Sequence, residues 1–251
     1  MRDFTNLTRQ AKQATAQRAW QNYLASDQVI LRSNQIERSD REYLEERGLL
    51  TKIVKGWHIV FPSANESEKI SIWKSSFWIF CREYLNDRFG EDWCLSADNS
   101  LLLHVGNWKI PDHAVVVARG ATNRFVRLLY DSTLYSSNHT LPEPDDIEIC
   151  RGIRIYRLEP ALVNATPEFY LNNSDDARRL LLLIVDRGLN VERIVSGDNL
   201  SGIGRLIGAL EATGDEHSAQ ALRAGMRRAG RTLRICNPFS GQFGWKRPIS
   251  P

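Results

Sequence analysis

Apolar residues recur at helix and strand spacings along most of the chain, and they predict a mixed α+β protein. Residues 14–25 carry apolar side chains three and four positions apart, which is typical of an amphipathic helix. Residues 1–12 lack this period, and we expect a flexible arm there. After residue 112 the pattern alternates and becomes β-branched, so strands are expected within residues 113–119, 125–130, 147–150 and 153–158.

A broad apolar stripe from Ile70 to Phe89 predicts a long helix that ends at Gly90. Its aromatic residues could form a base-stacking surface, but such a period is more typical of a helix packed in a core. Further helices are expected over residues 91–107 (starting near Ser96), 160–163, 166–171, 174–186, 203–210 and 219–229. The last two are expected to form a helical hairpin.

Residues 32–62 predict a helix-turn-helix with a β-hairpin wing. Ser39-Asp40 is a helix-start signal and Arg47-Gly48 a helix end, which predicts a second, exposed helix over residues 41–47. Two short strands are expected within residues 51–60, with Lys55-Gly56 at the turn. Such a helix can enter a DNA major groove while the hairpin reaches phosphates.

The residues expected to contact DNA are the cations of this region and the hydroxyl at the helix start: Arg32, Arg38, Ser39, Arg41, Arg47, Lys52 and Lys55. The alternative is that these are ordinary surface cations. In addition, the acidic residues Asp40, Glu42, Glu45 and Glu46 make the helix more acidic than most DNA-reading helices.

The linker-like sequence from Pro62 to Ser67 predicts a domain boundary. We expect a winged helix-turn-helix over residues 1–64, a larger mixed α+β domain over 65–172, a helical region over 173–236 and a disordered tail over 237–251.

The net charge of +3 is too small to indicate a nucleic-acid partner, but the charges are unevenly distributed. Residues 1–60 hold ten Lys/Arg against seven Asp/Glu, and residues 205–251 hold eight against three. The middle of the chain is acidic, with 15 against 20. Basic ends suit a protein that contacts phosphate, although solvated helix faces produce the same count.

The four cysteines lie too far apart for a paired metal or disulfide motif, so we expect reduced, buried thiols and no metal site. The amino-terminal residues lack the apolar segment of a secretory signal, and the run Leu180–Val185 is too short to span a membrane. These features predict a cytoplasmic protein without a membrane partner.

No group of residues has a recognisable catalytic spacing, so we expect neither an enzyme nor a bound cofactor. Gly202-Ile-Gly204 is not followed by the Lys-Ser/Thr of a phosphate-binding loop, and glycines at a helix start explain it better. His104 and His113 flank a short connection and could meet, although a structural role for each is the alternative.

The run YLEERGLLTKIVKGWHIVFP resembles the winged-helix signature of AbiEi-type antitoxins of type IV toxin-antitoxin systems. The similarity continues through WCLSADNSLLLHVGNW and HAVVVARG to RIYRLEPALV. The segments SGIGRLIGAL, ALRAGMRRAG and NPF resemble the region that precedes the catalytic domain in some Fic-family proteins with an antitoxin-like front. The Fic catalytic loop itself is missing, so AMP transfer is not expected.

The resemblance implies a DNA-binding antitoxin and autorepressor. Its partners would be double-stranded operator DNA and a cognate toxin encoded nearby, of the Fic or nucleotidyltransferase type. Arg223, Arg227 and Arg228 line one side of a helix and would suit an acidic toxin, unless they form a solvated face. The alternative function is a regulatory module that binds such a toxin without binding DNA.

Overall fold

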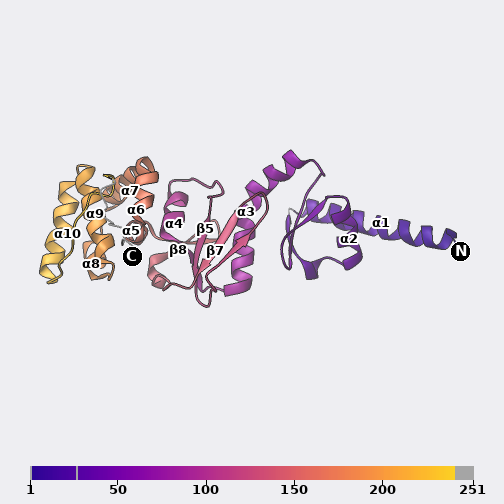
Figure 1. Cartoon of the computed structure of the whole chain (residues 1–251), viewed down its shortest axis with the longest axis horizontal. Helices are drawn as coiled ribbons and strands as arrows, with labels where there is room; N and C mark the ends of the chain where they lie inside the picture. The colour runs from indigo at the N-terminus through magenta and orange to yellow at the C-terminus, as the bar shows by residue number, and fades with distance from the viewer. Residues whose placement is uncertain (1, 27, 241–251) are drawn as a thin grey trace, which may run out of the picture. The chain divides into compact units, whose positions relative to one another are not determined.

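The computed structural model describes residues 2–26 and 28–240, with the backbone alone for residues 2–9 (Figure 1). It is a mixed α+β structure. Among the described residues, β1 (Ile30–Arg32), β3 (Trp57–Val60) and β2 (Leu50–Val54) form one sheet in that order, and β8 (Ile147–Cys150) pairs with β9 (Ile153–Tyr156). The chain divides into two compact units: Met1–Trp93 with Lys109–Ala114 and Arg119–Asn138, and Cys94–Trp108 with Val115–Ala118 and His139–Pro251.

The amino-terminal part of the first unit consists of a long helix, a short helix and three strands. Two antiparallel pairs place β3 between β1 and β2, and Gly56 adopts a φ of +87° in the turn between β2 and β3. Leu44 of the short helix packs against Leu31 and Val60 of the sheet. The elements are α1 (Arg2–Ala25), β1 (Ile30–Arg32), the 3-10 turn η1 (Ser33–Gln35), α2 (Arg38–Glu46), β2 (Leu50–Val54) and β3 (Trp57–Val60).

Three expectations for this region need correction. The flexible arm predicted over residues 1–12 is wrong, because α1 begins at Arg2; good helix formers such as Arg, Gln, Ala and Lys maintain a helix without a regular apolar stripe. The first of the two small helices is only a 3-10 turn, η1. The second helix begins at Arg38 with Glu37 as N-cap, so Ser39 lies inside its first turn.

The core position expected for the aromatic residues of the long central helix is confirmed. Helix α3 (Glu66–Phe89) starts at Asn65, whose side chain accepts bonds from two backbone N–H groups, and ends at Gly90 with a φ of +61°. Its aromatic side chains Trp73, Phe77, Phe80 and Tyr84 are buried. Trp57 of β3 packs edge-on against Phe80, with ring centroids 6.1 Å apart, so α3 covers one face of the small sheet.

The first unit also contains an antiparallel pair, β6 (Arg124–Arg127) and β7 (Thr133–Ser137). The sequence pattern did not predict β7, and it placed the end of β6 at Tyr130. The chain instead turns through Tyr130 and Asp131, which both have positive φ angles of 51° and 58°. The buried Trp73 Nε1–H donates to Ser132 Oγ at 3.1 Å, which ties this turn to α3.

The second unit is mostly helical. Ser96 is confirmed as an N-cap, but the helix expected over residues 91–107 is shorter, since a strand precedes it. Helix α8 was not predicted, and Asn173 rather than Ser174 occupies the N-cap of α7. The second unit contains all but the first residue of β4 (Trp93–Leu95) and of β5 (Ala114–Ala118). Its other elements are α4 (Ala97–His104), η2 (Pro144–Asp146), β8 (Ile147–Cys150), β9 (Ile153–Tyr156), α5 (Leu158–Asn164), α6 (Pro167–Asn172), α7 (Ser174–Arg187), α8 (Val191–Ser196), α9 (Leu200–Ala212) and α10 (Glu216–Arg228).

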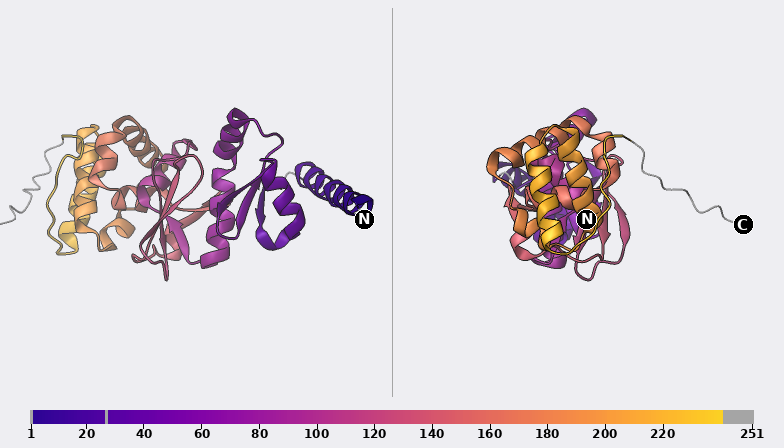
Figure 2. Two further views of the ribbon diagram at one scale, coloured as in Figure 1. Left: turned by 45° about the vertical axis from the view of Figure 1, so that its right-hand side comes forward. Right: turned by 90° about the vertical axis from the view of Figure 1, so that its left-hand side faces the viewer.

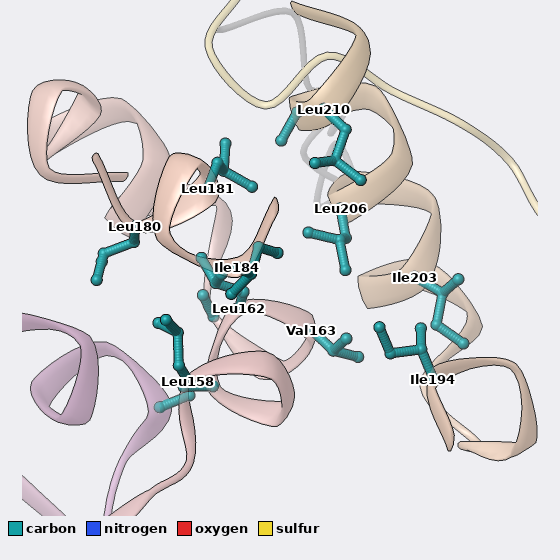
Figure 3. Packing of buried hydrophobic residues seen from close by; sticks show 14 of the residues in the cluster. Leu158, Leu162, Val163, Leu180, Leu181, Ile184, Ile194, Ile203, Leu206 and Leu210 are labelled. Atoms are coloured by element: carbon teal, nitrogen blue, oxygen red, sulfur yellow. The ribbon is translucent and has the colours of Figure 1, made fainter. Parts of the chain in front are cut away.

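Aliphatic residues from several helices form the core of the second unit. Leu162 of α5, Ile184 of α7 and Leu206 of α9 meet with Ile194 of α8, as Figure 3 shows. Helix α10 lies beside α9 (Figure 2) and adds Leu222 to the same cluster. This arrangement buries the apolar stripes that the sequence pattern predicted for these helices.

Glycines in α9 allow two other backbone segments to approach the helix closely. A Cβ atom at Gly202 would overlap the carbonyl oxygen of Val163, and one at Gly208 would overlap the carbonyl oxygen of Cys236. The Gly202-Ile-Gly204 motif therefore serves helix packing, which agrees with its interpretation as helix-start glycines. Of the tail expected to be disordered, residues 241–251 lie outside the described residues.

Replacing Gly208 with alanine is expected to destabilise the protein by about 1–3 kcal/mol, because the added methyl group displaces the backbone at Cys236. Urea unfolding followed by circular dichroism measures the change. Gln220→Ala, at an exposed position of α10, serves as the control and should leave the unfolding midpoint unchanged. Equal stability of the Gly208→Ala variant and the unaltered protein would contradict the close approach.

Candidate nucleic-acid interface

Helix α2 presents charged side chains on the side that faces away from its buried residues. Asp40 and Leu44 are buried, whereas Arg38, Glu42 and Glu45 are exposed. Arg38 Nε donates to Glu42 Oε1 at 2.8 Å, an i,i+4 ion pair that supports this short helix. The 3.6-residue turn of the helix also places Arg41 on this charged side.

His58 of β3 connects α2 to the sheet. The ring is buried, with Nε2 at 3.2 Å from Glu45 Oε1 and Nδ1 at 3.4 Å from Ser33 Oγ. Burial lowers the pKa of His58, and Glu45 partly offsets this effect. The charges of Arg41 and Lys52 lower the pKa further. Lys52 is the cross-strand partner of His58 in the β2–β3 pair, and Arg41 lies one turn before Glu45 in α2.

The pKa of Glu42 is affected by a second set of cations. Its pKa is lowered first by the hydrogen bond and charge of Arg38, and further by the charges of Arg41 and Lys12. Lys12 belongs to α1, so three helix and strand elements contribute to one group of charges. We call Lys12, Arg38, Arg41 and Lys52 the α2 basic cluster. With Glu42 and Glu45 among them, the group has a net positive charge.

The structure separates two of the sequence-predicted DNA contacts from this cluster. Arg32 lies on the α3 side of the sheet, where its guanidinium is 2.7 Å from Asp87 Oδ1 and stacks over the Trp57 ring at 5.1 Å. Arg47 stacks over Tyr43 at 4.5 Å. Arg47 follows Arg38 by nine residues, and at 3.6 residues per helical turn this spacing places the two arginines on opposite sides of α2. Arg32 and Arg47 thus point away from the face that carries Arg38 and Arg41.

The remaining predicted contacts lie at the surface. Ser39 is exposed in the first turn of α2, and Lys55 is exposed in the turn between β2 and β3. The sequence pattern does not mark His58 and Glu45 as organising residues, and it places Lys12 in the expected arm, where this lysine could follow a DNA backbone or belong to an uninvolved tail. No local pattern marks them, because their proximity results from the packing of α1 and the sheet against α2.

The arginines predicted to bind a toxin do not form one free surface. Arg223 Nε donates to Glu211 Oε1 of α9 at 2.8 Å, so this arginine joins the two helices. Arg227 and Arg228 are exposed in the last turn of α10, where the helix dipole favours positive charge.

A cleft of about 880 Å³ lies within the second unit, between α5, α8 and residues 140–146. Among its lining residues Arg193 is engaged, because its guanidinium donates to Asp146 Oδ1 at 2.6 Å. The cleft is therefore predominantly negative. Its carboxylates are Glu143, Asp145, Asp146, Glu159 and Asp198.

The cysteines and histidines have structural surroundings. Cys81 and Cys94 are buried, and burial raises the pKa of Cys94 to about 12; Cys150 and Cys236 are only partly buried, contrary to expectation. His104 Nε2 lies 2.8 Å from the Tyr156 carbonyl oxygen, and His113 Nδ1 lies 2.7 Å from Thr133 Oγ1. The described residues include no group of three or more potential ligands arranged around a metal.

None of the described helices has the length and apolar character needed to cross a membrane. Comparison of the chain with protein-family models and with curated proteins finds no match.

The lowered pKa of His58 predicts a loss of stability in acid. The unfolded chain binds a proton near pH 6.5 more readily than the folded protein does, so the free energy of unfolding falls as the pH drops below about 6.5. Urea unfolding at pH 7.5 and 5.5 measures this decrease. His58→Gln should reduce it, whereas His217→Gln, at an exposed position of α10, should retain it. The same decrease in the His58→Gln variant would contradict the assignment.

Proposed function

We propose that the chain is a DNA-binding antitoxin and autorepressor of a toxin-antitoxin system. Residues 1–64 would act as a winged helix-turn-helix, with α2 in the major groove of operator DNA and the β2–β3 hairpin as the wing. The second unit would bind or neutralise a Fic-type or nucleotidyltransferase toxin encoded nearby. The resemblance of residues 43–62 to AbiEi-type antitoxins supports this assignment.

The observation that carries the proposal is the α2 basic cluster. Its four cations come from α2 and from α1 and β2, which both contact α2, and each of these charges shifts the pKa of Glu42 or of His58. Cations spread over a helix and an adjacent strand are suited to phosphates on both sides of a groove. Lys55, which is exposed at the hairpin turn, adds a further cation on the proposed wing.

The carboxylates of α2 reduce the attraction to DNA but are themselves engaged. Glu42 is paired with Arg38, and Glu45 lies next to the His58 ring. The exposed ion pair is weak, so Arg38 can exchange Glu42 for a phosphate at little cost. Glu46 remains an exposed acid on this helix. We therefore expect binding dominated by phosphate contacts and strongly dependent on salt.

The test measures binding of the full chain to a duplex from its own promoter by fluorescence anisotropy at several salt concentrations. Replacing both Arg41 and Lys52 with glutamine removes two expected phosphate contacts. The slope of log affinity against log salt should become shallower by about 1.8, at roughly 0.9 per contact.

The matched control is Arg227→Gln with Arg228→Gln, which removes the same charge from α10. This variant should keep the original slope, since these residues lie on the second unit. An equal effect of both double variants would show that only net charge matters. Absence of duplex binding by the unaltered protein would overturn the proposal.

The acidic cleft favours a second candidate function, a regulatory module that holds a toxin without binding DNA. A cleft with five carboxylates suits a basic segment of a partner protein, and the acidic residues of α2 are consistent with a helix that avoids DNA. Co-purification with the neighbouring gene product at high salt, together with no duplex binding, would favour this function over the first.

A further inference from the structure

The β6–β7 pair exposes a group of aromatic rings on one face. Phe125 and Tyr135 are direct cross-strand partners, with ring centroids 4.6 Å apart. His113 packs edge-on against Phe125 at 5.7 Å. Phe125 is 62% exposed, which is unusual for a phenylalanine. The opposite face carries the buried Leu134, so the rings lie on the side facing away from the core.

The rings are held in place before any ligand binds. The strand register fixes Phe125 opposite Tyr135, and His113 Nδ1 lies 2.7 Å from Thr133 Oγ1. The Thr133 hydroxyl in turn donates to the Asp112 carbonyl oxygen at 3.2 Å. A ligand that stacks on this surface therefore does not have to order the side chains first, which reduces the entropy cost of binding.

Cations flank the rings on the same strand. Arg127 lies two residues after Phe125, on the same face and opposite Thr133, whereas Arg124 is exposed at the start of β6 on the other face of the strand. Between residues 123 and 137 the chain carries these two arginines and a single carboxylate, Asp131, in the turn. The strand that presents Phe125 is thus positively charged.

We propose that this face binds single-stranded nucleic acid, with a base stacked on Phe125 and a backbone phosphate paired with Arg127. Aromatic rings on a sheet face combined with arginines are the features by which proteins hold unpaired bases, because every base has a face that can stack. A duplex cannot use this face, since its bases already stack on one another. The site is therefore separate in chemistry from the α2 basic cluster.

The test uses the full chain with fluorescently labelled 15-nucleotide oligomers, oligo(dT) and oligo(rU), at low salt. Phe125→Ala should weaken binding of the preferred oligomer by about 5- to 100-fold, because one stacked base is lost. Phe125→Tyr retains the ring and should bind like the unaltered protein. Comparison of the two oligomers distinguishes DNA from RNA as the ligand.

Two control variants distinguish stacking on Phe125 from a general loss of apolar surface or of positive charge. Leu182→Ala removes a similarly exposed apolar side chain, 60% exposed on α7, and should not change the affinity. Arg41→Gln with Lys52→Gln should weaken duplex binding but not oligomer binding, so failure of one proposal does not depend on the other. Lack of oligomer binding, or equal affinity of the Phe125→Ala variant, would overturn the inference. So would a change only in oligomeric state, which would make the face an interface between proteins.

Discussion

The packing of α2 against the β1-β3-β2 sheet determines which charges of the amino-terminal region lie together. Leu44 supplies the apolar part of this contact and His58 the polar part. His58 can be buried because Glu45 and Ser33 each lie near one of its ring nitrogens. The same contact positions Arg41 and Lys52 near the ring.

This packing involves an electrostatic compromise. Two cations next to a buried imidazole disfavour its protonation, and the adjacent carboxylate only partly compensates. The fold therefore brings positive charges to a buried ring whose pKa they lower.

Both proposed surfaces belong to the first unit but differ in their physical basis. The α2 basic cluster consists of charged side chains, so salt will strongly weaken its electrostatic interactions. The β6–β7 face combines rings with arginines, and its stacking contribution is less sensitive to salt. The second unit is built differently, with an apolar helical core and an acidic cleft that suits a cationic partner. The candidate surfaces of the two units thus carry charges of opposite sign.

The sequence by itself determined the elements with strong periodicity or clear caps: α3 with its aromatic stripe and Gly90, the hairpin at Lys55-Gly56, and α9 with α10. It did not reveal β1, because the pairing of β1 with β3 joins residues distant in sequence, nor did it reveal β7, although β7 pairs with the preceding strand β6. Only the tertiary structure placed Arg32 against Asp87 and brought Lys12 of α1 close enough to lower the pKa of Glu42. The sign of each charge can be read from the chain, but its neighbours depend on how helices and strands pack.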